Sequence, residues 1–325
     1  MKIAINGFGR IGRMVFRVLQ NYPALEVIAV NDLTDAETLA HLLKFDSAHG
    51  RFPGEISAEE NAIIVNGKRI LLLSERDPEK LHWGELGIDV VVESTGRFTD
   101  KIKAHPHIRA GAKRVLITAP ATGGVKTIVY GVNNELIGGD DIYCTASCTT
   151  GAIAPVLYIL DKEFGIESGF MVTVHAITAD QNLQDAPHKD LRRARAAFVS
   201  IVPTSTGAAK AIGDVLPDLK GKLDGYAYRV PVIDGSIVDL SINLKREVTK
   251  EEIKSILSKY AKTALAGIMD YTEEQMVSSD IIGNTHSSIV DGSMTKTIGK
   301  LVKVVAWYDN EAGISNRIAE LIPLL

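Results

Sequence analysis

Cys148 and His175 carry the side chains that nucleophilic catalysis requires. Cys148 lies in "ASCTTGAIAP" at the predicted start of a helix, and His175 ends a predicted strand in "MVTVHAIT". An imidazole beside a thiol can accept its proton and later return it, which is how cysteine nucleophiles are activated. A free thiol has a pKa of about 8.5, and a helix N-terminus with a nearby imidazole lowers it. We therefore expect Cys148 to be substantially thiolate at neutral pH and to pair with His175.

The other cysteine and the other histidines are interpreted as structural residues. Cys144 lies in the strand-like "DIYCTAS" and is predicted to be a small buried side chain. Two cysteines cannot form a disulfide framework, and no nearby CxxC or histidine pair completes a four-ligand zinc site. We expect no metal and a reducing compartment. The histidines assigned to the surface or to packing are His41, His49, His82, His105, His107, His188 and His286.

The composition is that of a globular chain without a general affinity for nucleic acid or membranes. The 325 residues suggest about two domains, with 46% hydrophobic residues, 23% charged residues and a net charge of −4. A negative net charge supplies no electrostatic attraction to nucleic acid. No run approaches the ~18 apolar residues of a membrane span, and the N-terminus enters a strand without a signal peptide. We expect a cytoplasmic protein.

Short apolar segments alternate with helical patterns in the first third of the chain. This alternation predicts parallel βαβ units, with helices on both faces of a sheet. Thr34 and Glu37 have the spacing of a capping box, which predicts the start of the second helix. The alternating segments are 2–6, 12–21, 25–32, 35–45, 89–95 and 114–120.

A glycine-rich loop, "NGFGRIGR", follows the first predicted strand and opens the first helix. Gly7, Gly9 and Gly12 have the G-x-G-x-x-G spacing that allows a tight turn and lets the backbone approach a pyrophosphate. The second predicted strand ends at Asp32, twenty residues after Gly12. A carboxylate there accepts hydrogen bonds from the adenosine ribose and repels a 2′-phosphate. The pattern predicts an α/β, Rossmann-type dinucleotide-binding domain that uses NAD.

The pattern changes near residue 147, where longer strands follow one another with fewer helices between them. This change predicts a second domain of α+β type with a mixed or antiparallel sheet. We expect an NAD-binding domain over 1–147, a catalytic domain over 148–310, and a C-terminal helix, 311–325, that packs with the first domain. The strands expected in the second domain cover 169–178, 226–232, 236–248 and 300–309, and its helices lie near 152–164, 208–216 and 250–265.

Eight motifs are spread over almost the whole chain: "NGFGRIGR", "FDSAHGRF", "ASCTT", "TVHAIT", "HKDLRRARAA", "PTSTGAAKAIGDVLPDLKGKLDG", "YRVPV" and "WYDNE". They resemble the motifs of phosphorylating glyceraldehyde-3-phosphate dehydrogenases. The resemblance implies that a cysteine attacks the aldehyde of glyceraldehyde 3-phosphate, that hydride passes to NAD, and that inorganic phosphate cleaves the resulting thioester to give 1,3-bisphosphoglycerate. It also implies a homotetramer, with residues 180–197 along a subunit interface.

The resemblance assigns roles residue by residue. It makes Cys148 the nucleophile and His175 the acid/base, and it places Thr178 and Arg229 at the substrate phosphate. The residues implied for the attacking phosphate, or for the region that both phosphates share, are Ser147, Thr149, Arg193, Thr206 and Gly207. The residues implied for NAD are Gly7, Gly9, Arg10, Ile11, Gly12, Asp32, Arg76, Thr118 and Asn310.

Three of these positions have a structural alternative on the residues alone. Thr206 is also typical of a helix N-cap, and Asn310 is typical of a turn. Arg193 belongs to "LRRAR", a charged run that usually forms a solvent-exposed face. The family position favours the functional interpretation at each of the three residues.

The chain departs from the family pattern at several positions. Gly151 and Ala152 replace the asparagine and cysteine that usually follow "CTT", and Ala312 and Ile314 replace two aromatic residues of "NEWGYS". Two other functions stay open as alternatives. One is erythrose-4-phosphate dehydrogenase, a related Cys–His enzyme, and the other is a non-catalytic NAD-binding interaction protein.

Overall fold

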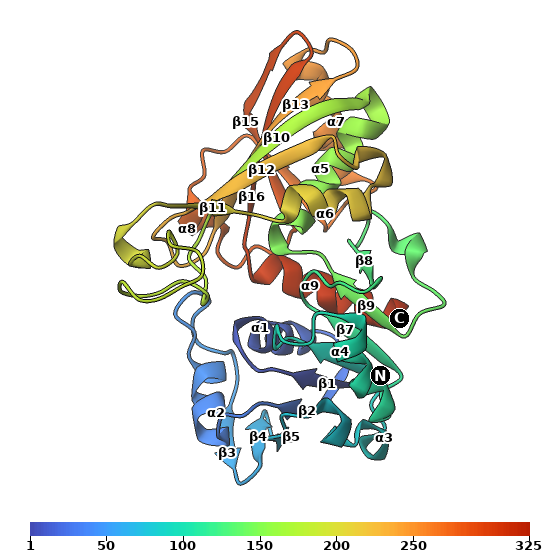
Figure 1. The fold of residues 1–325 in the computed structure, drawn as a ribbon, viewed down its shortest axis with the longest axis vertical. Coiled ribbons are helices and arrows are strands. Elements are labelled where there is room, and N and C mark those ends of the chain that lie inside the picture. The colour runs from blue at the N-terminus through green and yellow to red at the C-terminus, as the bar shows by residue number, and fades with distance from the viewer. The chain divides into compact units, whose positions relative to one another are not determined.

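Two compact units make up the chain (Figure 1). The computed structural model describes residues 1–325. Unit 1 comprises Met1–Ile128, Asn134–Ala146 and Ser315–Leu325, and unit 2 comprises Val129–Asn133 and Ser147–Ile314.

Unit 1 is built on a nine-stranded sheet. Its strands are β1 (Lys2–Asn6), β2 (Glu26–Asn31), β3 (Ile56–Glu59), β4 (Ala62–Val65), β5 (Lys68–Leu73), β6 (Val90–Glu93), β7 (Arg114–Ile117), β8 (Lys126–Ile128) and β9 (Ile142–Thr145). The order is β3-β4-β5-β2-β1-β6-β7-β9-β8, and all neighbours from β5 to β8 run parallel. Val90, Val91 and Val92 of β6 are fully buried, as expected for a parallel strand covered on both faces. The Rossmann-type prediction is confirmed.

The helices of unit 1 follow the strands as the βαβ pattern predicts. They are α1 (Arg10–Leu19), α2 (Ala36–Lys44), α3 (Trp83–Leu86) and α4 (Lys101–Arg109), and α9 (Ala312–Leu321) belongs to this unit from Ser315 on. The apolar face of α1 packs on β1 and β2 with Val15 and Phe16 buried. This packing holds the N-terminus of α1 at the carboxyl ends of the two strands.

The predicted start of α2 is wrong by one residue. Asp35, rather than Thr34, precedes the helix in an extended conformation, and its carboxylate accepts a hydrogen bond from the Thr38 N–H at 2.8 Å. Aspartate caps helices somewhat better than threonine. The capping box of Thr34 and Glu37 therefore does not form.

Unit 2 is built on a seven-stranded sheet. Its strands are β10 (Ile166–His175), β11 (Val202–Ser205), β12 (Leu223–Arg229), β13 (Ser236–Leu244), β14 (Met269–Thr272), β15 (Ser288–Ile298) and β16 (Leu301–Tyr308). The order is β11-β12-β10-β13-β16-β15-β14. β10 runs parallel to β12 and antiparallel to β13, so the predicted mixed sheet is confirmed. The parallel register places His175 of β10 opposite Arg229 of β12.

Three helices of unit 2 lie on the same side of this sheet (Figure 1). They are α5 (Cys148–Phe164), α6 (Ala208–Val215) and α7 (Lys250–Lys262), and a single turn, α8 (Ser278–Ile281), follows later. α5 packs on β10, β13, β15 and β16, with Ile153, Val156 and Leu157 fully buried. The central position of α5 fixes its first turn against the end of β10.

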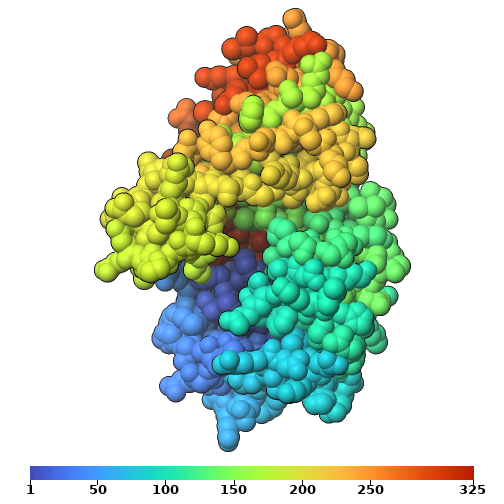
Figure 2. Space-filling view, in the orientation of Figure 1, coloured from blue at the N-terminus to red at the C-terminus, as the bar shows by residue number.

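A long segment, 176–201, connects β10 with β11 and lies on the surface of unit 2, yellow-green to yellow in Figure 2. Its exposed apolar side chains are Leu183, Leu191, Phe198, Val199 and Ile201. The chain also has short 3-10 helices at Pro78–Leu81, Asn134–Leu136, Ala197–Val199, Pro217–Leu219 and Ile322–Leu324. None of the helices combines the length and the apolar character needed to cross a membrane.

Candidate functional site

The first residue of α5 is Cys148. Ser147 precedes it in an extended conformation, and the Ser147 Oγ accepts a hydrogen bond from the Thr150 N–H at 3.1 Å. This side chain caps the helix and leaves the other N–H groups of the first turn available to acceptors near Cys148. The predicted helix start at Ser147 and Cys148 is confirmed.

His175 lies beside the thiol at the end of β10. The Cys148 Sγ and the His175 Nε2 are 3.4 Å apart. The His175 Nδ1 lies 2.7 Å from the carbonyl oxygen of Ala176, so Nδ1 bears a proton and donates it there. Nε2 therefore presents its lone pair to the thiol. The structure brings the two predicted residues together with the imidazole tautomer that can accept the thiol proton.

Burial determines the protonation of this pair. Burial, together with the charge of Arg229, lowers the pKa of His175 to about 4. Burial also raises the pKa of Cys148, although the charge of Arg229 opposes that change. The raised pKa of Cys148 does not favour the expected thiolate, because the cost of burying a charged sulfur outweighs the effect of the nearby positive charge. Both shifts favour a neutral thiol beside a neutral imidazole.

Arg229 ends β12 next to this pair. Its Nη1 donates to the Thr178 Oγ1 at 2.9 Å and to the Ala176 carbonyl at 3.1 Å. Nη1 also lies 3.0 Å from the His175 Nδ1. Because Nδ1 already donates to Ala176, we interpret this distance as a close approach of two donors. Burial lowers the pKa of Arg229, but a guanidinium stays charged at neutral pH and disfavours protonation of His175.

Asp180 joins the predicted residues Thr178 and Arg193, and the sequence analysis missed it. Both the Thr178 hydroxyl and the Arg193 Nη1 donate to its carboxylate. Burial alone would raise the pKa of Asp180, but the Thr178 hydrogen bond and the charges of Arg193 and Arg229 lower it overall. Arg193 also lies 3.7 Å from the Asp190 carboxylate, so two guanidinium groups and two carboxylates meet in this region. The only sequence signal for Asp180 is its place two residues after Thr178.

Arg193 is held against the strand that leads to α6. Its Nε donates to the Thr204 Oγ1 at 3.0 Å, and its side chain is 19% exposed, so the alternative of a solvent-exposed face is wrong for this arginine. Gly207 is the N-cap residue of α6, and the Thr206 Oγ1 accepts a hydrogen bond from the Ala208 N–H at 3.2 Å. Thr206 therefore satisfies an N–H of the first turn, as a capping residue does.

Tyr308 connects the first turn of α5 to β10. Its hydroxyl lies 2.9 Å from the Thr149 Oγ1 and 2.8 Å from the Thr173 Oγ1. Its ring meets the His175 ring edge-on, with centroids 5.9 Å apart. Burial raises the pKa of Tyr308, so the phenol stays neutral. The Thr149 hydroxyl is directed toward Tyr308, and the pair restrains both sides of the Cys148 and His175 contact.

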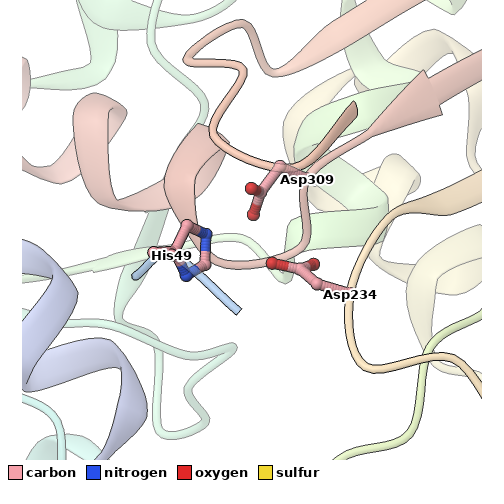
Figure 3. Close-up of side chains that lie close together, drawn as sticks. All are labelled: His49, Asp234 and Asp309. Carbon is pink, nitrogen blue, oxygen red and sulfur yellow. The ribbon is translucent and has the colours of Figure 1, made fainter. Parts of the chain in front are cut away.

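Asn310 is linked by hydrogen bonds, through Ser236, to Ala176, the residue that follows His175. The Ser236 Oγ accepts from the Ala176 N–H at 3.1 Å and donates to the Asn310 Oδ1 at 2.8 Å. The Asn310 N–H donates to Asp234 at 3.2 Å. The carboxyl groups of Asp234 and Asp309 lie near each other (Figure 3). Burial and the charge of Asp309 raise the pKa of Asp234 to about 7.

The glycine loop of unit 1 has the conformation that its spacing predicts. Gly7 has φ +91°, and a Cβ there would lie 2.7 Å from the Thr95 nitrogen. A Cβ on Gly12 would lie 2.1 Å from the carbonyl oxygen of Gly7. A Cβ on Gly9 would meet no atom within 4 Å. Two glycines therefore allow close backbone packing, and the third leaves the approach to α1 open.

A cavity of about 310 Å³ lies at the carboxyl ends of the strands of unit 1. The Asp32 carboxylate is at its wall, where it accepts hydrogen bonds from the Phe8 N–H at 2.8 Å and the Thr34 N–H at 3.0 Å. The lining residues are Asn6, Gly7, Gly9, Asn31, Asp32, Leu33, Glu75, Arg76, Ser94, Thr95, Arg97 and Phe98. The structure thus brings together four residues predicted for NAD, namely Gly7, Gly9, Asp32 and Arg76.

Four other residues predicted for NAD in unit 1 do not line this cavity: Arg10, Ile11, Gly12 and Thr118. The Arg10 guanidinium pairs with Asp46 at 2.6 Å, and the Thr118 hydroxyl donates to the Glu93 carbonyl at 3.2 Å. The lining residues that the sequence analysis missed lie mostly at strand ends. The rule that ligands bind at the carboxyl ends of parallel strands could have identified them.

The chain matches two family descriptions. Residues 1–101 match "Glyceraldehyde 3-phosphate dehydrogenase, NAD binding domain", and residues 147–310 match "Glyceraldehyde 3-phosphate dehydrogenase, C-terminal domain". The chain belongs to the glyceraldehyde 3-phosphate dehydrogenase family. The first match contains the glycine loop and Asp32, and the second contains Cys148, His175 and Arg229.

Individual members of the glyceraldehyde 3-phosphate dehydrogenase family are similar over the whole length. Glyceraldehyde-3-phosphate dehydrogenase from Geobacillus stearothermophilus is 55% identical, over 99% of this chain and 97% of the relative. Glyceraldehyde-3-phosphate dehydrogenase 2 from Bacillus subtilis (strain 168) is 54% identical, over 99% and 96%. The enzyme from Mycobacterium avium is 54% identical, over 100% and 98%. The resemblance inferred from the eight motifs is confirmed.

Proposed function

We propose that the protein is an NAD-dependent, phosphorylating glyceraldehyde-3-phosphate dehydrogenase of glycolysis and gluconeogenesis. The observation that carries the proposal is the 3.4 Å approach of the Cys148 Sγ to the His175 Nε2 beside the Arg229 guanidinium. A thiol with a neutral base can attack an aldehyde, and guanidinium groups bind phosphate oxygens in a fixed geometry. Together they favour a phosphorylated aldehyde as the substrate.

The reaction begins with proton transfer from Cys148 to His175 as the sulfur attacks the aldehyde carbon. The carbonyl electrons move to the oxygen, which takes up the proton from His175 to give a thiohemiacetal. His175 then accepts the hydroxyl proton while the carbonyl re-forms and a hydride leaves the carbon. NAD, when bound, supplies the acceptor for that hydride. Cys148 is left as a thioester.

Inorganic phosphate completes the reaction. One of its oxygens attacks the thioester carbon, and the C–S bond breaks with its electrons on the Cys148 sulfur, which takes back the proton held by His175. N–H groups in the first turn of α5 are suited to stabilise the oxyanion that forms. We assign Thr178 and Arg229 to the substrate phosphate. We assign the attacking phosphate to Ser147, Thr149, Arg193, Thr206 and Gly207.

The residues of unit 1 fit the adenosine half of NAD. Gly9 leaves open space before α1, where N–H groups and the helix dipole favour a pyrophosphate. Asp32 is placed to accept hydrogen bonds from the ribose, which favours NAD over NADP. Arg76 supplies a further donor at the cavity wall. Arg10, Ile11, Gly12 and Thr118 complete the proposed set in this unit, and Asn310 of unit 2 is proposed for the nicotinamide carboxamide.

The decisive experiment is NADH formation from glyceraldehyde 3-phosphate and NAD, with and without inorganic phosphate. We expect phosphate-dependent activity in the wild type and none in Cys148→Ala. Cys144→Ala is the matched control, because Cys144 is a buried cysteine of unit 1 that forms no disulfide, and we expect it to retain activity. Activity that survives in Cys148→Ala, or a turnover without phosphate, would contradict the proposal.

The same assay separates the triose substrate from erythrose 4-phosphate. We expect a higher kcat/KM for glyceraldehyde 3-phosphate, and we expect its turnover to require phosphate. A preference for erythrose 4-phosphate would reassign the substrate while leaving the roles of Cys148 and His175 intact.

We also propose that the protein forms a homotetramer in the cytoplasm. Cys144 and Cys148 are in the reduced form, which fits a reducing compartment. Val199 and Ile201 are 82% and 68% exposed on the segment 176–201, and exposed apolar patches mark protein interfaces. We expect Val199→Asp to lower the mass measured by light scattering. Ile102→Asp, at an equally exposed residue of α4, is the matched control and should leave the mass unchanged.

A further inference from the structure

The carboxyl group of Glu93 is buried in unit 1 directly behind the dinucleotide cavity. Glu93 ends β6, in register with Asn6 of β1, and Asn6 is in register with Asn31 of β2. The exposed fractions of the three residues are 1%, 1% and 5%. Asn6 and Asn31 line the cavity, whereas Glu93 does not. Glu93 is therefore placed to act on the cavity through its neighbours.

The orientation of the two amides follows from one fixed donor. The Glu75 N–H can only donate, and it donates to the Asn31 Oδ1 at 2.9 Å. The Asn31 Nδ2 must then donate to the Asn6 Oδ1 at 2.6 Å. The Asn6 Nδ2 is left to donate to the Glu93 Oε2 at 2.5 Å. The last group in this chain of hydrogen bonds, the Asn6 amide, is therefore a donor to Glu93.

A second chain reaches the same oxygen from α4. The Trp83 Nε1–H can only donate, and it donates to the His107 Nδ1 at 3.0 Å. Nδ1 is thus the acceptor of the ring, so the proton is on Nε2, which donates to the Glu93 Oε2 at 3.1 Å. Trp83 and His107 are both fully buried. This side of the network is sealed from solvent and cannot exchange its partners for water.

Thr95 occupies the other carboxyl oxygen. Its N–H and its hydroxyl both donate to the Glu93 Oε1, at 2.8 and 2.5 Å. Four donors thus converge on Glu93, and none of them can accept a proton from it in this arrangement. A buried acceptor with four matched donors holds each donor in one place, because any other rotamer leaves the carboxylate unsatisfied.

We propose that Glu93 is a positioning residue for NAD binding. Its carboxylate fixes the Asn6 amide and the Thr95 backbone and hydroxyl at the cavity wall. Through Asn6 it also orients Asn31, whose Nδ2 and Oδ1 hold both backbone groups of Glu75, next to Arg76. The inference rests on the proposed placement of the adenosine half of NAD in this cavity. Substitution of Glu93 should therefore weaken NAD binding without changing the chemistry at Cys148.

Glu93→Gln is the main test, because glutamine keeps the shape and presents an N–H where the network supplies only donors. We expect the KM for NAD to rise about tenfold or more, as for loss of a hydrogen bond to a charged group. The KM for the aldehyde and the kcat at saturating NAD should stay within about twofold. The assay uses the full-length wild-type and variant enzymes.

Trp83→Phe is the matched variant. It removes a donor from the far end of the same network, and its site is equally buried. We expect a lower Tm with the KM for NAD within about twofold of wild type. A purely structural role for the network predicts the opposite pattern, in which both variants change Tm and KM together. An unchanged KM for NAD in folded Glu93→Gln, or an equal rise in Trp83→Phe, overturns the inference.

Two further variants keep the test decisive. Glu93→Asp retains the carboxylate but withdraws it by one methylene, so it replaces Glu93→Gln if that variant does not fold, with the same expected rise in KM for NAD. Asp32→Ala reports on the cavity itself, and we expect it also to raise the KM for NAD. If Asp32→Ala leaves that KM unchanged while Glu93→Gln raises it, the proposed placement of the coenzyme fails, and this inference fails with it.

Discussion

The surroundings of Glu93 in unit 1 and of His175 in unit 2 are both buried and polar. They differ in how completely the hydrogen-bond donors are paired with acceptors. Four donors meet the Glu93 carboxylate, two at each oxygen. At His175, Nδ1 faces both an acceptor, the Ala176 carbonyl, and a second donor, Arg229. The Asp180 carboxylate accepts a hydrogen bond from Arg193, and the charge of Arg229 also acts on it. At Glu93 every donor has an acceptor, so the network holds its residues in fixed positions. At His175 donors face one another, so the groups there are able to transfer a proton or to bind an anion.

The largest expected effect is the loss of proton transfer between Cys148 and His175. His175→Asn keeps a donor toward Ala176 and removes the base beside Cys148. We expect kcat to fall by about 10²–10⁴, the usual contribution of a general acid–base residue. Steady-state kinetics with saturating NAD measures this loss. A fall of less than about tenfold would remove His175 from the mechanism.

A second test removes the charge of Asp234 and, with it, the repulsion between Asp234 and Asp309. The pKa of Asp234 is raised to about 7, against about 3.9 in an unfolded chain. The contribution of Asp234 to the free energy of unfolding is therefore fully present below about pH 3.9. This contribution is lost as the pH rises through 7, and the complete loss amounts to about 4 kcal/mol. We expect Asp234→Asn to be more stable than wild type at pH 8 and equally stable at pH 4.

Denaturant unfolding across this pH range measures the effect of Asp234→Asn. The matched control is Asp224→Asn, since Asp224 also accepts from the following N–H, at 2.8 Å, but is exposed. This control should show no gain at pH 8. A gain of the same size in both variants would mean that neither the burial of Asp234 nor the charge of Asp309 is its cause.

A third test changes the cation that faces His175. We expect Arg229→Leu to raise the KM for glyceraldehyde 3-phosphate about tenfold or more, as for a lost charged hydrogen bond. The same change should raise the pKa of His175, because the Arg229 charge helps to lower it. The acid limb of kcat/KM against pH should then move to higher pH. Arg229→Lys keeps the charge and should leave that limb closer to wild type.

The smallest expected effect concerns the first turn of α5. Gly151 is helical, and an added Cβ would meet no atom within 4 Å. We expect Gly151→Ala to stabilise the protein by about 0.5–1 kcal/mol, since alanine loses less conformational freedom in a helix. Gly213→Ala in α6 is the contrast, because its Cβ would lie 3.1 Å from the Lys220 Cα. A lower Tm for Gly151→Ala would show hidden crowding beside Cys148.

The sequence predicts the chemistry of unit 2 better than its electrostatics. Cys148 and His175 are identifiable because each stands at the end of a regular element with a strong local signal. The sign of the pKa change at Cys148 is not predictable in this way, because burial depends on what α5 packs against. Asp180 has no local signal either, since its partner Arg193 lies on the other side of a long loop.

In unit 1 the sequence predicts the backbone but not the buried network. Gly7 and Asp32 follow from the glycine spacing and the strand end. The role of Glu93 depends on the register of three strands and on a helix that carries His107, and no short motif contains this information. The error at the start of α2 has a simpler cause, because two good capping residues, Thr34 and Asp35, stand side by side.

The separation of contacts along the chain has a consequence for the newly made protein. Cys148 and His175 are 27 residues apart, whereas the Tyr308 contact with Thr149 spans 159 residues. Contacts between nearby residues form sooner than distant ones, and synthesis proceeds from the N-terminus. The thiol and the imidazole can therefore meet on the ribosome before β16 has been translated. The Tyr308 contacts that restrain both sides of this pair are thus among the last to form.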